Sequence, residues 1–420
     1  MTPPPTNTLP PDKPPPDATP SWRGLPAGVW AMGFASLFMD MSSELIHSLL
    51  PIFMVAGLGA SMLTVGIVEG VAEATAAIMK VFSGTLSDYL GRRKFLMVLG
   101  YGLAALTKPV FPLAGSVGWV FAARFVDRVG KGIRGAPRDA LVADITAPAV
   151  RGAAYGLRQA LDSVGAFLGP LLAVALMLWF ANDFRTVMWF AVIPAFISVA
   201  LLIVYVREPE RAPAHEGRAR SRMPLRLADA KRLSSAYWII VAIGAVFTLA
   251  RFSEAFLLLR GQYAGLDLGY APLVMIVMNV FYAAAAYPAG AAADRFSHRA
   301  LLLLGLALLI ASDVVLAQAS SPLMVFAGAA LWGLHMAFTQ GLLSKLVADT
   351  APADLLGTGF GIFHLVSGVA MLLASVIAGA LWSEFGPAAT FIAGAVFAAI
   401  TAAGLLLYRT TPRQPVTPSP

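Results

Sequence analysis

Four carboxylates and one imidazole recur at helical spacing near the start of the chain. Asp40, Glu44 and His47 are spaced i, i+4 and i+7, and Glu69 and Glu73 are spaced i, i+4. Each set therefore falls on one face of a helix. Carboxylates clustered in an apolar setting are suited to binding and releasing protons. Carboxylates with a histidine also suit a divalent cation, and salt bridges to nearby basic residues are the purely structural alternative.

Further charges lie in the apolar runs that follow. Because charge inside such a run is costly, it should face a cavity or an opposite charge. We therefore expect a proton- or cation-coupling set of Asp40, Glu44, Glu69, Glu73, Asp127 and Asp162. Its expected partners in the cavity are Arg124, Arg128, Arg158 and His47. The second half is less charged, and its candidates for lining a substrate cavity are Arg251, Glu254, Asn279, His335 and His364.

The composition places these residues in a membrane protein. Hydrophobic residues make up 58% of the chain and charged residues 13%, whereas a soluble domain carries about 25% charged residues. The chain has no cysteine, which excludes disulfides and thiolate metal sites. It has no phosphate-binding loop, so it has no ATPase of its own. We predict neither enzyme activity, nor a cofactor, nor a resident metal. The net charge of +7 lies in loops, where it orients a membrane protein and does not indicate nucleic-acid binding.

Twelve runs of the chain are long and apolar enough to cross a bilayer. They lie near 28–56, 61–83, 95–115, 118–136, 154–181, 186–206, 236–259, 270–291, 300–318, 321–344, 358–382 and 387–408. With the N-terminus inside, the outside loops contain only Arg185 and Arg260 of all the Lys and Arg residues, while most of the others lie inside. The positive-inside rule then predicts a multi-pass protein of the inner membrane with both termini cytoplasmic.

The chain is internally duplicated. The string Leu141-Val-Ala-Asp144 reappears 205 residues later as Leu346-Val-Ala-Asp349. The fold class predicted from this repeat is an all-α integral membrane protein with twelve transmembrane helices in two pseudo-symmetric six-helix bundles. Duplicated bundles of this kind are typical of secondary transporters. We expect a disordered proline-rich tail at 1–26, bundles at 27–206 and 235–409, a basic linker at 207–234 and a short tail at 410–420.

The loop after the second run carries a distinctive motif. The string Gly84-Thr-Leu-Ser-Asp88-Tyr-Leu-Gly91-Arg92-Arg93-Lys94 resembles the signature loop of the major facilitator superfamily. A weaker copy stands 206 residues later, at Gly290, Asp294 and Arg299. In that family the loop stabilises the outward-open state through contacts between the bundles. The resemblance therefore implies a gating role for Gly84, Asp88, Gly91, Arg92, Arg93, Asp294 and Arg299.

Two further strings extend the resemblance. Arg124, followed by Gly130 and Gly132, is similar to the family motif linked to proton transfer, although Arg128 stands where glycine is usual. Gly165, Gly169 and Pro170 are similar to the motif of the exporting antiporter branch, and small residues four apart also favour tight helix packing.

These features favour a monomeric, proton-coupled exporter of a small molecule or ion that works by alternating access in the lipid bilayer. Short strings at 127–132 and 138–141 are similar to nickel-resistance efflux proteins, so divalent metal efflux is the alternative. A non-transporting membrane scaffold and a membrane enzyme are further possibilities. Because most buried charge lies in the first half, we assign ion coupling to that half and substrate contacts to the second.

Overall fold

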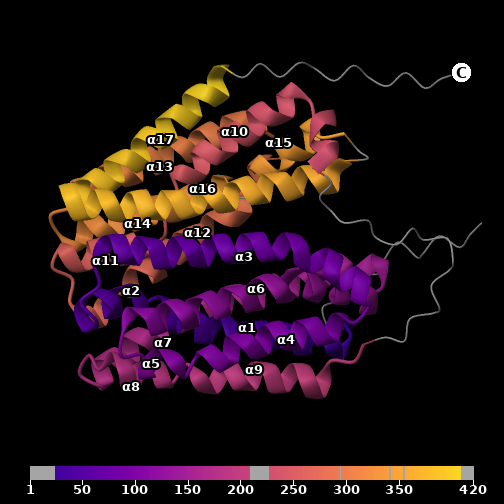
Figure 1. The fold of residues 1–420 in the computed structure, drawn as a ribbon, viewed down its shortest axis with the longest axis horizontal. Helices are drawn as coiled ribbons and strands as arrows, with labels where there is room; N and C mark the ends of the chain where they lie inside the picture. The colour runs from indigo at the N-terminus through magenta and orange to yellow at the C-terminus, as the bar shows by residue number, and fades with distance from the viewer. Residues whose placement is uncertain (1–23, 209–226, 294, 340–341, 353–354, 408–420) are drawn as a thin grey trace, which may run out of the picture.

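The computed structural model describes residues 24–208, 227–293, 295–339, 342–352 and 355–407. The described residues form helices and connecting loops, with no strand among them. Figure 1 shows long helices running side by side in two groups, one from the first half of the chain and one from the second. Asp294, most of the linker and most of both predicted tails lie outside the described residues.

The first half contains six long helices and several short ones. The long helices are α1 (Ala27–His47), α3 (Met62–Leu90), α4 (Arg93–Thr107), α6 (Val117–Ile145), α7 (Arg151–Trp179) and α9 (Val192–Tyr205). The short elements are α2 (Leu50–Ile52), the π-helical η2 (Phe53–Gly57), α5 (Val110–Leu113), the 3-10 turn η3 (Pro148–Val150) and α8 (Phe184–Trp189). Helix α1 packs against α7 and α9, while α6 packs against α3 and α4.

The second half repeats this plan. Its helices are α10 (Ser235–Leu249), α11 (Ala255–Tyr263), α12 (Leu273–Ala293), α13 (His298–Ala317), α14 (Pro322–Thr339), α15 (Leu342–Thr350), α16 (Leu356–Phe385) and α17 (Pro387–Leu407). Two 3-10 turns, η4 (Leu227–Arg232) and η5 (Leu268–Tyr270), precede α10 and α12. Helix α14 packs against α12 and α13, α13 against α17, and α10 against α16.

Each predicted membrane run coincides with one helix or with two or more consecutive helical elements. Within the described residues, 10 helical segments are long and apolar enough to cross a bilayer. The other two runs depart for physical reasons. Helix α6 has 29 residues but carries many charged side chains, and α10 has only 15 residues because the predicted run 236–259 is interrupted between Leu249 and Ala255. The run predicted at 236–259 is thus formed by two helices, α10 and α11, which residues 250–254 separate.

The interruption occurs at the same place in both repeats. Helix α1 ends at His47 and α2 begins at Leu50, while α10 ends at Leu249 and α11 begins at Ala255. Pro51 lacks a backbone N–H and favours the first break, whereas residues 250–254 contain neither proline nor glycine. Discontinuous helices leave free backbone groups, and transporters use such helices at their binding sites.

In each half, an equivalent polar contact joins the start of the third membrane run to the end of the sixth. Lys94 Nζ donates to the Ile203 carbonyl at 2.9 Å, joining the start of α4 to the end of α9. In the second half Arg299 donates to the Leu406 carbonyl, joining the start of α13 to the end of α17. Lys94 and Arg299 both belong to the repeated loop motif, so the repeat is preserved in these contacts as well as in the helix order.

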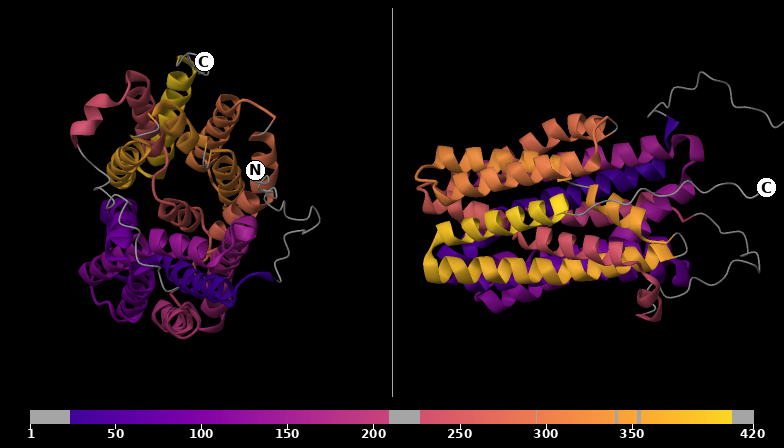
Figure 2. Two further views of the ribbon diagram at one scale, coloured as in Figure 1. Left: turned by 90° about the vertical axis from the view of Figure 1, so that its right-hand side faces the viewer. Right: turned by 90° about the horizontal axis from the view of Figure 1, so that it is seen from above.

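The two halves meet along α3 and α16, which lie side by side at the junction of the two groups in Figures 1 and 2. Glycines bring their backbones together. A Cβ built on Gly66 would lie 2.2 Å from the Ser375 carbonyl oxygen, and one built on Gly379 would lie 2.5 Å from the Met62 carbonyl oxygen. Only glycine permits this approach, as at other close helix pairs in membranes.

The apolar cores show where the halves are joined. The largest core contains residues of both halves, including Leu45, Met177 and Phe256, at the end of the molecule where α2, α8 and α11 lie. Two smaller cores lie toward the other end, and each belongs to one half, within residues 25–206 and 233–405. The two bundles thus share one apolar core at one end of the molecule, and each has a separate core at the other end.

We predict that Gly66→Ala weakens the joint between the halves. The added methyl group meets the backbone of α16, which cannot move aside as a flexible side chain would, and overpacking costs about 1–3 kcal/mol. The midpoint of thermal unfolding in detergent should fall. Gly102→Ala is the control, because a Cβ there meets nothing within 4 Å. Equal midpoints for both variants would contradict the prediction.

Candidate transport site

A cavity of about 410 Å³ lies between the two halves, within the size range of small-molecule sites. From the first half it is lined by Glu44, His47, Pro51, Glu69, Glu73, Arg124, Arg128 and Lys131. From the second half it is lined by Arg251, Phe252, Ser253, Glu254, Ala255, Leu258, Met275, Trp332 and Met371. Both interrupted helices therefore contribute to its wall. The charged lining comes from α1, α3, α6 and the segment 250–254.

Two ion pairs join α3 to α6 at the cavity wall. Arg124 Nη2 lies 2.6 Å from Glu69 Oε2, and Arg128 Nη2 lies 2.7 Å from Glu73 Oε1. Arg124, Arg128 and Glu69 are buried. Gly132 permits the close packing of the two helices, because a Cβ there would lie 2.4 Å from Met79 Cβ. Two of the predicted coupling carboxylates are thus already neutralised by predicted partners.

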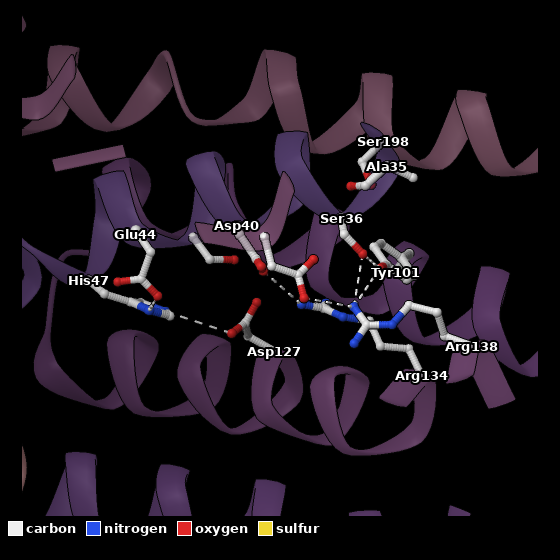
Figure 3. A network of polar contacts seen from close by, with 12 residues as sticks. Ala35, Ser36, Asp40, Glu44, His47, Tyr101, Asp127, Arg134, Arg138 and Ser198 are labelled. Carbon is white, nitrogen blue, oxygen red and sulfur yellow. Dashed lines mark hydrogen bonds and ion pairs between the residues drawn. The ribbon is translucent and has the colours of Figure 1, made fainter. Parts of the chain in front are cut away.

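A second polar chain runs from the cavity into the first bundle (Figure 3). His47 Nδ1 lies 3.6 Å from Glu44 Oε1, and His47 Nε2 lies 3.8 Å from Asp127 Oδ2. Lys108, which is fully buried, donates to Asp127 Oδ1 at 2.8 Å and to Ser43 Oγ at 3.0 Å. The imidazole therefore lies between a cavity carboxylate and a buried ion pair, but its distances to both are longer than a hydrogen bond.

A third network lies farther along α6, away from the cavity lining (Figure 3). Arg134 Nη2 is 3.8 Å from Asp40 Oδ1. Arg158 Nη1 is 2.6 Å from Asp162 Oδ2, and Arg138 Nη1 is 3.8 Å from that same oxygen. The contacts of the predicted residues Asp40, Asp162 and Arg158 therefore join helices of the first bundle. None of these three side chains lines the cavity. Arg134 lies near the end of the predicted run 118–136 and Arg138 lies beyond it, whereas α6 continues to Ile145.

Three cavity charges have no ion pair among the described residues. They are Lys131 on α6 and, on the interrupted segment, Arg251 and Glu254. The Arg251 guanidinium lies 5.7 Å from the centre of the Phe247 ring. Free charges on both sides of a membrane cavity are costly unless water or a ligand meets them. They are the groups most available to a substrate or a proton.

The other candidates in the second half lie outside the cavity lining. His335 is fully buried, with Nδ1 3.1 Å from the Gly305 carbonyl oxygen. His364 packs against Phe360 and Phe363. Asn279 does not line the cavity either. Only Arg251 and Glu254 of that predicted set reach it.

The signature loop makes several contacts within the first half. Gly91 ends α3 in the left-handed region, with φ of 64°, which favours glycine. Arg93 pairs with Asp144 near the end of α6 and donates to the Ala140 carbonyl at 2.9 Å. Arg92 directly precedes Arg93, and a Cβ built on Gly84 would lie 3.6 Å from Ala136 Cβ, while the Asp88 side chain is outside the described part of the structure. The gating role implied by the resemblance remains a prediction.

The second glycine motif has a clear packing role. A Cβ built on Gly165 would lie 2.4 Å from the Leu37 carbonyl oxygen, and one on Gly169 would lie 2.7 Å from the Met41 carbonyl oxygen. Pro170, also buried, follows within α7. These glycines let α7 lie directly against α1, the helix that presents Glu44 to the cavity.

Sequence reasoning missed several cavity residues. Phe252, Trp332, Met275 and Met371 form the apolar part of the wall. Their residue types are common in any apolar run, so no pattern in the sequence distinguished them. The one available signal was position in the chain, since Arg251 and Glu254, both predicted to line the cavity, flank Phe252.

The family model described as Major Facilitator Superfamily matches residues 32–279 and 255–420. The chain belongs to the major facilitator superfamily. An uncharacterized MFS-type transporter of Methanocaldococcus jannaschii is 32% identical over 393 residues, covering 92% of this chain and 95% of that protein. Multidrug resistance protein MdtH of Edwardsiella ictaluri is 28% identical over 198 residues, covering 46% of this chain and 48% of that protein.

Solved structures agree on the fold. The crystal structure of nucleoside transporter NupG covers 91% of this chain and 99% of its own, with a TM-score of 0.71 and 11% sequence identity. A bacterial homologue of the human lysosomal transporter Spinster covers 90% and 95%, with a TM-score of 0.70 and 15% identity. The predicted family and fold class are confirmed: this member of the superfamily is an all-α, multi-pass membrane transporter.

We predict that the effects of Lys108 and Asp127, a buried ion pair, on the free energy of unfolding are strongly coupled. Lys108→Met or Asp127→Asn alone leaves an uncompensated group in the bundle and should cost about 3–5 kcal/mol. The double variant removes both charges and should lose less than the two single losses combined. Thermal unfolding of the four proteins gives the coupling energy as a double-mutant cycle. Simple additivity would show that the pair contributes no interaction of its own.

Proposed function

We propose that this transporter is a proton-coupled antiporter that exports a small molecule across the inner membrane. The observation that carries the proposal is the cavity between the bundles, in which carboxylates and cations from both halves face one another. Glu44 comes from α1 and Glu254 from the interrupted segment of the second half. A group that binds either a proton or a cationic part of a substrate, but not both, couples the movement of protons to the movement of substrate.

Glu44 and Glu254 are the cavity carboxylates best placed for this exchange. Glu69 and Glu73 each lie within 2.7 Å of an arginine nitrogen. By contrast, the nearest partner of Glu44 is His47 at 3.6 Å, and Glu254 forms no ion pair with the described residues. A carboxylate without a fixed cation can change its protonation without leaving a buried arginine unpaired.

The arrangement of the cores supports alternating access. With the orientation predicted from Lys and Arg, the end at which the bundles share one core is extracellular. The cytoplasmic ends then have separate cores, as an inward-facing conformation requires. Rocking of the bundles about α3 and α16 would expose the cavity to the other side.

Two observations support export. The glycine motif of α7 resembles that of the exporting branch, and one relative carries the name multidrug resistance protein. The metal alternative rests on the short strings at 127–132 and 138–141, and no group of three or more His, Asp or Glu side chains in the described part of the chain is arranged to hold a metal ion. A small organic substrate with a cationic group fits the cavity better.

The test uses everted membrane vesicles whose lumen is acidified by respiration. A pH-sensitive dye reports proton release when ethidium, other cationic drugs or nickel ions are added. We expect at least one organic cation to release protons from vesicles containing the protein. Release equal to that from vesicles without it, across the whole panel, would refute coupled antiport. A response to nickel alone would replace the organic substrate with a metal.

Within that assay, Glu254→Gln should abolish proton release, because the amide cannot exchange a proton. Binding of the responding drug, measured by its fluorescence, should persist in part, since the cavity keeps its shape. Glu384→Gln is the matched control, because Glu384 is an exposed glutamate at the end of α16. Full activity of Glu254→Gln would show that this carboxylate does not carry the proton.

A further inference from the structure

Asp313 lies isolated in the interior of the second bundle. It is on α13, its exposed fraction is 0%, and neither carboxylate oxygen has a hydrogen-bond partner. A charged carboxylate without a cation or a hydrogen-bond donor from the protein is strongly disfavoured in such surroundings. In this conformation the side chain is therefore suited to hold a proton and be neutral. Nothing in the packing of α13 alone requires an acid at this position.

A glycine on the neighbouring helix α17 leaves space for the Asp313 carboxyl group. A Cβ built on Gly394 of α17 would lie 2.6 Å from Asp313 Oδ2 and 3.0 Å from Phe252 Cε1. Asp313 and Phe252 thus occupy the same gap beside Gly394. The ring of Phe252 lies 5.5 Å from those of Trp332 and Phe391, measured between centroids. Phe252 and Trp332 also line the transport cavity, so one layer of aromatic rings separates the cavity from Asp313.

The charged groups on the surrounding elements are engaged elsewhere. Helix α17 has no titratable residue in its described length. On α14, His335 contacts the Gly305 carbonyl, and on α11, Arg260 donates to carbonyls at the end of α13, including that of Leu316 at 2.7 Å. Arg251 and Glu254 line the cavity on either side of Phe252. No described cation therefore neutralises Asp313, and a proton is the one ligand that the site can hold here.

The segment that covers Asp313 is not helical. Residues 251–253 lie outside both α10 and α11, and this segment carries Phe252. It is also held to the other half, since Ser253 Oγ lies 3.4 Å from Glu69 Oε2. A movement of one bundle against the other would therefore pull on the segment that covers the carboxyl group.

We propose that Asp313 is a second proton-binding site, which exchanges its proton with the cavity when the segment 250–254 moves Phe252 aside. The proposal rests on the proposed function and adds a site outside the cavity lining. In the conformation shown, Asp313 is covered and carries the proton. When the bundles rock, water reaches Asp313, the carboxyl group releases its proton to that water, and the carboxylate remains solvated until it is protonated again. Protonation of Asp313 thus favours the present conformation.

The test follows the conformation directly and needs no known substrate. The chain has no cysteine, so spin labels can be placed at Tyr89→Cys and Phe296→Cys alone. Both positions are exposed, at 77% and 62%, and lie at the end where the cores are separate. Distances between the labels are measured by pulsed electron resonance in lipid nanodiscs, from acid to alkaline pH. The same pair is placed in Asp313→Asn, which mimics the neutral acid.

The wild-type label distance is expected to change as pH rises, while Asp313→Asn stays at the low-pH distance throughout. Ser312→Ala is the control and should respond as wild type, because it removes only the neighbouring hydrogen bond to the Gly328 carbonyl. If Asp313→Asn does not fold, Asp313→Ser, also neutral and smaller, takes its place. Infrared difference spectra between acid and alkaline pH should show one carboxylic-acid band in the wild type that is missing in the neutral variant.

The outcomes separate this site from the function. A pH response in Asp313→Asn equal to that of wild type overturns the second site, while the vesicle assay for antiport is unaffected. No pH response in any protein also overturns it, and the vesicle assay then decides antiport by itself. A response in wild type that the neutral variant lacks, together with loss of the infrared band, supports the proposal.

Discussion

The cost of placing charge inside a membrane governs the first half of this protein. Arg124, Asp127 and Arg128 lie on α6, and all three are buried. Each would be strongly disfavoured in hydrocarbon without an opposite charge. Helix α6 must therefore lie between α3, which supplies two glutamates, and α4, whose end leads to Lys108. The glycines of α6 let these helices come close enough for the pairs to form.

The second half contains fewer buried charges, so the need to pair them restricts its helix packing less. It carries fewer charges, and its helices are held by apolar and aromatic packing around Phe252 and Trp332. It can therefore leave a segment outside the helices beside the cavity, with Arg251 and Glu254 exposed to whatever enters. The two halves share a plan, seen in the contacts of Lys94 and Arg299, but divide the work unequally. In the proposed antiporter, a highly charged bundle that faces a less charged one would be a physical basis for coupling a proton to a movement.

Reading the sequence located much of the site but could not rank its members. The i, i+4 spacing placed Glu69 and Glu73 on one face, and both reach the cavity. The predicted sets also included Asp40, Asp162 and His335, which lie elsewhere in the bundles. Spacing specifies the direction of a side chain around its own helix, but not which neighbour that face meets. The burial of Asp313 likewise depends on Gly394, which is 81 residues away in the chain.

The sequence by itself determined the class, the repeat and the approximate position of every membrane run, because hydrophobicity is a local property and only helices or closed barrels can cross a bilayer. Only the tertiary structure decided which charges pair, which remain free in the cavity and where α10 stops. Those outcomes depend on the distances between helices from both halves. Residues 250–254 show the difference most clearly: nothing in their types breaks a helix, and the cavity that they line exists only once the two bundles have met.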